Sequence, residues 1–200
     1  MRNHLVIMAR QPRRGRVKSR LAADIGPGPA LTVYRRLLAR TLRRLARDSR
    51  WTVVLAVTPP RQARRPSRWQ RGLPAIAQVE GDIGLRMAAA MAAVPQGRVV
   101  LVGSDIPGIT RSHVAAAFRA LDGHDAVFGP AEDGGFWLVG LAPSLRGAPL
   151  FAGVRWSSAH ALDDAVASLP PEARVARVAL LSDIDDGRDL ARWRARRKPV

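Results

Sequence analysis

The stretch MARQPRRGRVKSRL, near the N-terminus, holds side chains suited to binding an anion. Arg10, Lys18 and Arg20 are cationic, and Gly15 would let backbone N–H groups approach a phosphate closely. The stretch is not a Walker-type phosphate loop, which requires Gly immediately before the Lys, a position that Val17 holds here. It is therefore either a phosphate-binding loop of another kind or an ordinary basic surface loop.

A carboxylate follows the apolar run RVVLVG at residues 98–103, which reads as a buried strand. Asp105 lies in the GSDIP segment just beyond this run. A carboxylate at the carboxyl end of a buried strand can bind Mg²⁺ or Mn²⁺, which prefer oxygen ligands and bridge to phosphates. The alternative is an Asx-turn or helix cap, but a cap usually lies nearer its helix. The spacing therefore favours a metal-binding role for Asp105.

The stretch GPAEDGGFWLVG places Glu132 and Asp133 directly before Gly134 and Gly135. The carboxylates suit a second metal ligand or a contact with a sugar hydroxyl, and the glycines allow the backbone to approach a ligand. Asp-Gly is also a strong signal for a hairpin turn. The two interpretations are compatible with each other.

Two further stretches favour different roles. In QVEGDIGLRM, the glycines around Gly81 would let a base or sugar lie against the backbone near Gln78, and Asp82 is a plausible helix N-cap. The later DIDDGRDLARW is interpreted as the start of the last helix, with Asp185 or Asp186 as its cap. The four His residues have no metal-ligand spacing, and no G-x-S-x-G or Cys nucleophile is present.

Short apolar runs alternate with helical patterns along the chain, and these elements must position the candidate residues. Strands are predicted at 4–9, 51–59, 75–79, 98–103, 125–130, 136–141 and 176–180, and helices at 29–48, 85–94, 111–121, 158–169 and 186–196. This alternation predicts a mostly parallel sheet with helices on both faces. Ligands of such sheets bind beyond the carboxyl ends of the strands, where the candidate segments lie.

Length and composition favour one globular domain covering residues 1–200, with 47% hydrophobic residues and no apolar run near 18 residues. We therefore expect no membrane insertion. The N-terminal apolar run is too short for a signal-peptide core, so a cytoplasmic location is expected. The chain has no Cys, which excludes disulfides and thiolate metal sites.

The formal net charge is +17, and nearly all of the cationic residues are Arg. This charge is compatible with nucleic acid, acidic membranes, phosphorylated substrates or a GC-rich genome, which favours Arg codons. In the helix predicted at 29–48, apolar and cationic residues occupy opposite faces, as on a solvated amphipathic helix. No aromatic residues interleave with these Arg residues to stack bases, so no nucleic-acid partner is expected.

The motifs also occur together in a particular order: MARQPRRGRVKSRL, QVEGDIGLRM, VGSDIP, GPAEDGGFWLVGL, LFAGVRWS and LSDIDDGRDL. In this order the chain resembles a bacterial family of glycosyltransferase-A type, linked by name to radical-SAM or selenium-domain proteins and to arsenosugar biosynthesis. The resemblance spans almost the whole chain. It implies an α/β, Rossmann-like nucleotide-diphospho-sugar transferase fold with a central, mostly parallel mixed sheet flanked by helices. The implied ligands are a nucleotide or nucleotide-sugar, Mg²⁺ or Mn²⁺, and a small-molecule acceptor.

The resemblance also implies roles for single residues. Arg10 and Lys18 match an Arg and a Lys that stabilise charge on the reacting phosphate, as in the similar loop of phospholactate guanylyltransferases. Asp105 matches the metal-binding acid, and Gln78 and Gly81 lie where such proteins contact the nucleobase.

The chain departs from the family pattern at three places. Ser19 stands where Thr is common, Leu85 where Glu is common, and FW at residues 136–137 where a Tyr-Tyr pair is frequent. The last change removes hydroxyl groups that could contact an acceptor, so the identity of the acceptor stays open.

The leading hypothesis is a metal-dependent transferase that moves a glycosyl group from a nucleotide-sugar to a small-molecule acceptor. One alternative is a nucleotidyltransferase that joins an NTP to a phosphorylated small molecule and releases pyrophosphate. The other is a non-catalytic nucleotide- or nucleic-acid-binding protein. The candidate residues are Arg10, Lys18 and Asp105 for catalysis; Ala9, Gly15, Arg20, Gln78, Gly81, Asp82 and Ser104 for the nucleotide or phosphate; Glu132, Gly134 and Gly135 for substrate; and Asp105 and Asp133 for the metal.

Overall fold

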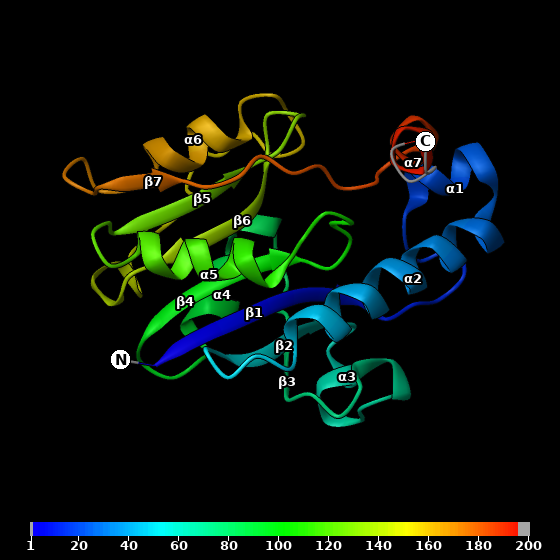
Figure 1. Ribbon diagram of the computed structural model, residues 1–200, viewed down its shortest axis with the longest axis horizontal. Helices are drawn as coiled ribbons and strands as arrows, with labels where there is room; N and C mark the ends of the chain where they lie inside the picture. Colours follow the sequence, from blue (N-terminus) through cyan, green and yellow to red (C-terminus); the bar gives the residue numbers. More distant parts are fainter. Residues whose placement is uncertain (1, 196–200) are drawn as a thin grey trace.

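One mixed sheet organises the chain (Figure 1). The computed structural model describes residues 2–195, and in this part the strand order is β3-β2-β1-β4-β6-β5-β7. The strands are β1 (Asn3–Arg10), β2 (Thr52–Thr58), β3 (Ala75–Ala77), β4 (Arg98–Gly103), β5 (Ala126–Pro130), β6 (Phe136–Leu141) and β7 (Val175–Arg177). Only β6 runs antiparallel to its neighbours among these strands. The predicted mostly parallel mixed sheet is therefore confirmed.

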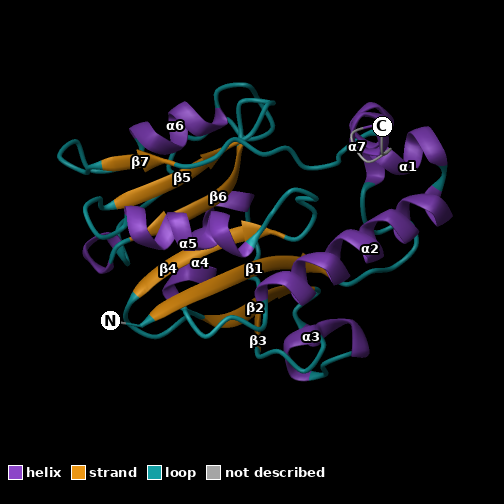
Figure 2. Cartoon of the chain, in the orientation of Figure 1, coloured by secondary structure: helices purple, strands orange, loops and turns teal. Residues whose placement is uncertain are grey.

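Helices cover both faces of the sheet (Figure 2). They are α1 (Ser19–Ile25), α2 (Pro27–Leu45), α3 (Arg61–Arg64), α4 (Ile83–Ala92), α5 (Arg111–Ala120), α6 (Ala161–Ala167) and α7 (Gly187–Ala195), with 3₁₀ turns at Arg68–Gln70 and Pro143–Leu145. The predicted helices agree with α2, α4, α5, α6 and α7, and residue 196 of the last prediction lies outside the described residues. Helices α1 and α3 were not predicted, and β3 and β7 end earlier than the strands predicted at 75–79 and 176–180.

The apolar runs of β1 and β4 bury both of their faces. In β1, Leu5 and Ile7 pack with residues of α2 and α5, whereas Val6 packs on the opposite side with residues of α4. In β4, Val100 faces the first side and Val99 the second. Strands covered on both faces are expected to read as continuous hydrophobic runs, which is why these two were easy to predict.

A small third core lies beyond the end of the sheet, where α1 and α7 are side by side (Figure 1). Leu21 of α1, Leu37 of α2 and Leu190 of α7 pack there around Ile184, which is 1% exposed. The backbone N–H at the start of α7 also donates to a carboxylate oxygen of Asp24 in α1, at 2.7 Å. These contacts bring the C-terminal segment against the loop that follows β1.

Helix α2 is amphipathic, as predicted. Leu38 and Leu42 are buried, and Arg36 and Arg43 are exposed. Arg44 differs from the predicted solvated face, because it is half-buried and donates to backbone carbonyls of the loop after β4. Arg44 thus helps to hold that loop in place. No helix in the part of the chain that the structure describes is both long and apolar enough to cross a membrane.

Candidate functional site

A cleft of about 500 Å³ opens at the carboxyl ends of β1 and β4. Strand β1 lies between β2 and β4. After β1 the chain forms β2 and β3 on one side of it, and then forms β4 on the other side, so the strand order reverses at β1. Such a switch point is where ligands of α/β sheets bind. The lining includes eight of the predicted site residues: Ala9, Arg10, Gly15, Lys18, Arg20, Gln78, Ser104 and Asp105.

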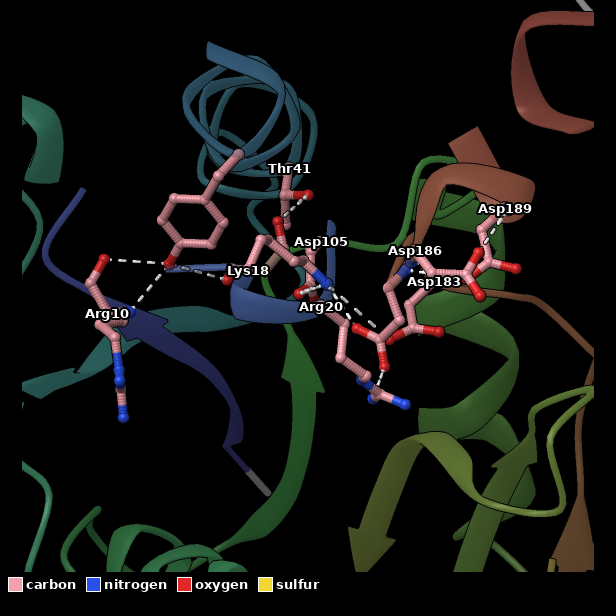
Figure 3. Close-up of polar contacts among 11 residues, drawn as sticks. Arg10, Lys18, Arg20, Thr41, Asp105, Asp183, Asp186 and Asp189 are labelled. Carbon is pink, nitrogen blue, oxygen red and sulfur yellow. Dashed lines mark hydrogen bonds and ion pairs between the residues drawn. The ribbon is translucent and has the colours of Figure 1, made fainter. Parts of the chain in front are cut away.

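Three carboxylates gather at one end of this cleft. Asp105 comes from the loop after β4, and Asp183 comes from the segment before α7 (Figure 3). Asp185 belongs to the same segment as Asp183. One oxygen atom of each lies within 4.8 Å of the others. Burial, together with the neighbouring carboxylates, raises the pKa of Asp183 to about 7 against the opposing effect of Lys18.

Lys18 lies among these carboxylates and is 7% exposed. Its Nζ atom is 2.6 Å from Asp105 Oδ2, 2.8 Å from Asp185 Oδ1 and 4.0 Å from Asp183 Oδ2. Burial acts to lower the pKa of Lys18, but the three carboxylates outweigh this effect and raise the pKa above its ordinary value. The same ammonium group helps to lower the pKa of Asp185 despite the burial of that carboxyl. The predicted proximity of Lys18 and Asp105 is thus present as a direct ion pair.

The backbone of Lys18 is left-handed, with φ 50° and ψ 57°, immediately before α1. This conformation is uncommon for residues that carry a Cβ atom and costs about 1–3 kcal/mol. It turns the chain from the loop into α1, where Arg20 forms an ion pair with Asp185 from the exposed side. The ion pairs at Lys18 and Arg20 therefore hold an otherwise unfavourable turn.

Tyr34 of α2 connects the ends of β1 and β4. Its hydroxyl accepts a hydrogen bond from the Arg10 N–H and donates to the Arg10 carbonyl, both at 2.9 Å. It also lies 3.4 Å from the hydroxyl of Ser104, whose carbonyl accepts from Thr41 at 3.2 Å (Figure 3). Burial raises the pKa of Tyr34. The predicted residues Arg10 and Ser104 are thus anchored through their backbones, and the Arg10 side chain remains exposed in the cleft.

Gln78 is a buried polar residue that lines the other side of the cleft. Its Nε2 atom donates to the carbonyls of Ala56 at 2.6 Å and Ala9 at 3.4 Å, and its Oε1 atom accepts from Arg86. Burial lowers the pKa of Arg86, and the charge of Arg10 adds to this effect. Gln78 therefore positions a guanidinium group at the cleft.

The residues after Gln78 play a structural part in the fold. Asp82 is the N-cap of α4, as predicted, and its Oδ1 atom accepts from the Leu85 N–H at 2.8 Å. Gly81 has a φ of 120°, a conformation that favours glycine. Neither residue is among those that line the cleft, and their role toward a nucleotide stays a prediction.

Residues 131–135 form the predicted hairpin turn between β5 and β6. Asp133 Oδ1 accepts from the Gly135 N–H at 3.0 Å, and Asp133 is not one of the three clustered carboxylates. Glu132 forms an ion pair with Arg192 at 3.6 Å. Gly134 has a φ of 83°, and a Cβ atom there would lie 2.2 Å from a backbone oxygen. The metal role predicted for Asp133 and the substrate roles of Glu132, Gly134 and Gly135 stay predictions.

Sequence reasoning missed Asp183 and Asp185, because their segment was interpreted as a helix start. That interpretation is correct for Asp186, whose Oδ1 atom accepts from the Asp189 N–H at 2.9 Å in the first turn of α7. The available signal was the i, i+2 spacing of two carboxylates around Ile184. With the apolar residue buried between them, Asp185 lines the cleft, and Asp183 Oδ2 lies 4.0 Å from Lys18 Nζ.

Comparisons with known proteins agree with this architecture. The model of a family described as "Uncharacterized protein conserved in bacteria (DUF2064)" matches residues 41–158. A solved structure of a candidate nucleotide-diphospho-sugar transferase from Desulfovibrio desulfuricans G20 has 29% identity and a TM-score of 0.88, and the match covers 99% of this chain and 89% of that one. The comparison with curated proteins found no significant match.

Two more distant structures share the fold. Rv0371c of Mycobacterium tuberculosis H37Rv, in a complex with manganese, has 17% identity and a TM-score of 0.60 over 96% of this chain and 97% of that one. CMP:2-keto-3-deoxy-manno-octonic acid synthetase, in a complex with CTP, has 14% identity and a TM-score of 0.58 over 98% of each chain. The predicted nucleotide-diphospho-sugar transferase fold is confirmed, and the link by name to radical-SAM and arsenosugar proteins stays a prediction.

Proposed function

The chain belongs to the DUF2064 family, and we propose that it transfers a glycosyl group from a nucleotide-sugar to a small-molecule acceptor with the help of a divalent metal. The observation that carries this proposal is the cluster of Asp105, Asp183 and Asp185 around Lys18, at the end of the cleft. A cleft of about 500 Å³ is within the range of small-molecule and cofactor sites. The fold is shared with structures described as nucleotide-diphospho-sugar and nucleotidyl transferases.

The cationic side chains of the cleft suit the diphosphate of such a donor. Lys18 and Arg20 lie beside the carboxylate cluster, and Arg10 and Arg86 lie along the wall that Gln78 supports. Guanidinium groups pair with phosphate oxygens through two parallel hydrogen bonds, and the ammonium group acts as a compact charge. The positive φ of Gly15 and the open space around it allow the loop backbone to turn there.

The carboxylate cluster fits a divalent metal. Three oxygen donors within 4.8 Å of one another, on half-buried residues, are the chemistry that Mg²⁺ and Mn²⁺ prefer. Asp105, Asp183 and Asp185 would hold the ion. When bound, it would supply positive charge that offsets the negative charge developing on the leaving diphosphate.

The chemistry of the proposed transfer is balanced by the two substrates alone. An oxygen or nitrogen of the acceptor forms a bond to the anomeric carbon of the sugar, and its proton passes to solvent water. The bond between that carbon and the diphosphate oxygen breaks, and the nucleoside diphosphate leaves with the electron pair. Lys18 and Arg20 stabilise this developing charge from the side of the cleft, which is the electrostatic contribution expected of a transferase site.

Calorimetry with UDP-, GDP- and dTDP-sugars and with NTPs, each with and without Mn²⁺, tests the proposal. We expect one class of nucleotide-sugar to bind only with metal, and Asp105→Asn to abolish the metal-dependent part. Asp163→Asn is the matched control, because that carboxylate is 75% exposed and does not line the cleft. Unchanged metal-dependent binding in Asp105→Asn would refute the site assignment.

Nucleotidyl transfer is the second candidate function. Lys18 and Arg20 beside a carboxylate cluster would equally hold the triphosphate of an NTP, and the structural neighbour in a complex with CTP has the same fold. The products separate the two reactions. Release of pyrophosphate from an NTP and a sugar phosphate supports nucleotidyl transfer, whereas release of NDP from an NDP-sugar supports glycosyl transfer.

A further inference from the structure

A second cavity of about 310 Å³ adjoins the nucleotide cleft on the far side of the carboxylate cluster. The two cavities share six lining residues, which are Met8, Arg20, Ile83, Gly103, Asp105 and Asp185. We call this second cavity the inner chamber. Its walls come from β4, β6, α4 and the segment 156–158. A molecule in the inner chamber would therefore meet a nucleotide-bound group at the carboxylates.

Aromatic and aliphatic side chains form most of the chamber walls. Phe136 and Trp156 are half-buried lining residues whose ring centroids lie 6.1 Å apart. Phe151 supports both from behind, at 6.4 Å from Phe136 and 6.0 Å from Trp156. Further lining comes from Met87, Leu101, Ile106, Trp137, Leu138 and Val139. Rings held in this way provide a flat surface for an apolar or aromatic face of a ligand.

The charges of the inner chamber have the opposite sign to those of the cleft. Its lining has four carboxylates, those of Asp105, Asp133, Asp183 and Asp185. Arg20 is the only cation among the described lining residues, and it is already paired with Asp185. A divalent ion at the cluster, together with Lys18, would only offset the three clustered carboxylates. A phosphate or carboxylate group on a second substrate would thus meet no net positive charge in the chamber, whereas the cleft lining has five cations and two carboxylates.

We propose that the inner chamber binds the second substrate, and that this substrate is a neutral or cationic molecule without phosphate or carboxylate groups. It has a flat apolar face that packs on Phe136 and Trp156, and its hydroxyl or amino group points toward Asp105. The role of this molecule as glycosyl acceptor rests on the proposed function, whereas its binding does not. The inference weighs against nucleotidyl transfer, because the second substrate of that reaction is phosphorylated.

Small probes that share one ring test the inference without any nucleotide. Phenyl β-D-glucoside, benzylamine and phenyl phosphate are compared by saturation-transfer NMR, and phenyl phosphate is also tested as a competitor of the glucoside. We expect the glucoside and benzylamine to bind, and phenyl phosphate to displace the glucoside at least ~10-fold less effectively than benzylamine does, which corresponds to about 1.4 kcal/mol. Displacement by phenyl phosphate as effective as that by benzylamine would overturn the proposal, and so would a failure of both uncharged and cationic probes to bind.

Variants locate the binding in the chamber. Phe136→Leu is expected to weaken glucoside binding by about 10-fold, because it removes a ring face but keeps an apolar side chain. Trp156→Phe reduces the other ring face of the chamber and should also weaken glucoside binding. Trp69→Leu is the matched control, since that indole is also half-buried but lines neither cavity. With thermal melting showing that each variant is folded, unchanged binding in both chamber variants refutes the inference.

The outcomes separate this inference from the proposed function. Metal-dependent binding of nucleotide-sugars depends on Asp105 and the cleft, whereas the ring probes depend on Phe136 and the chamber. Failure of the ring probes alone would overturn the acceptor chemistry and leave donor binding standing. Failure of nucleotide-sugar binding alone would overturn the proposed function and leave the chamber as a site for neutral ring compounds.

Discussion

Replacing Lys18 with Met tests how the carboxylate cluster is held together. The variant keeps a long apolar stem and removes the ammonium group that lies 2.6 Å from Asp105 and 2.8 Å from Asp185. The Lys18 side chain is 7% exposed, so the carboxylates that remain would be only partly compensated by water. Removing one partner of a buried ion pair costs about 3–5 kcal/mol.

The expected loss for Lys18→Met is at the lower end of that range, about 3 kcal/mol, because Arg20 still pairs with Asp185 and the three carboxylates are half-buried. For a chain of this length, about 3 kcal/mol corresponds to a fall in melting temperature of roughly 6–12 °C. Arg155→Met is the matched control. It breaks a pair with Asp164 in which the Arg side chain is 61% exposed, and exposed pairs contribute about 0–1 kcal/mol.

Thermal melting in metal-free buffer and then with Mn²⁺ measures both effects. The ion should raise the melting temperature of Lys18→Met more than that of the parent protein, because the cluster in the variant no longer contains a competing cation. A ligand at about 100 times its Kd raises the free energy of unfolding by roughly 2.7 kcal/mol. A variant that melts within about 2 °C of the parent protein in metal-free buffer would show that the ion pairs contribute little to stability. Equal metal responses in the two proteins would refute the assignment of the cluster as the metal site.

Three further predictions concern single residues. Hydrogen bonds from Arg50 lower the pKa of Asp48 to about 2, below the value of about 3.9 in an unfolded chain. The pair therefore stabilises the fold above pH ~4 and loses this effect as the pH falls toward ~2, so Asp48→Asn should cost about 1 kcal/mol at pH 7 and nothing at the acid end of a melting series. Gly134→Ala places a Cβ atom against backbone and should lower the free energy of unfolding by about 2–4 kcal/mol. Gly15→Ala has open space around the new Cβ atom and should lower it by about 1 kcal/mol. Equal denaturation midpoints of the two variants would contradict this prediction. Asp133 lies outside the cluster of Asp105, Asp183 and Asp185, and Asp133→Asn keeps the oxygen that accepts from the Gly135 N–H. Mn²⁺ affinity measured by calorimetry should therefore not change, whereas a loss of ~10-fold or more would support the metal role predicted for Asp133 from the sequence.

The sheet was predictable because its central strands are buried on both faces and are therefore apolar at nearly every position. Leu5 and Ile7 face one core and Val6 the other, so the run is apolar at every position. Helix α1 was missed for the opposite reason. In the structure Leu21 is its only fully buried residue, and the helix begins after the left-handed turn at Lys18, which distant carboxylates stabilise. A helix held by such long-range contacts has no local pattern to reveal it.

The site was predictable to the extent that it lies at strand ends. Lys18 and Asp105 each follow a recognisable strand, and the structure brings them into contact. Asp183 and Asp185 follow the strand predicted at 176–180, but the observed strand β7 ends at Arg177. The position of the two carboxylates depends instead on the packing of Ile184 against α1 and α2 in the small third core. That packing joins segments more than 140 residues apart, as the hydrogen bond between the start of α7 and Asp24, 163 residues earlier, also shows. The hydrophobic periodicity of a short sequence segment carries no information about such a contact.

The reversed direction of β6 has a consequence for how such a protein can diversify. Because β6 runs back from the carboxyl edge, its first residue, Phe136, and the short hairpin before it lie at the site. Most of the chamber lining is thus encoded after residue 100, and about half of it by the segments 131–139 and 156–158, whereas most of the cationic cleft is encoded before residue 90. Changes in hairpin length or aromatic content would alter the proposed acceptor site without disturbing the loop proposed to bind phosphate. The proposed donor site would then stay constant while a few residues late in the chain change the proposed acceptor site.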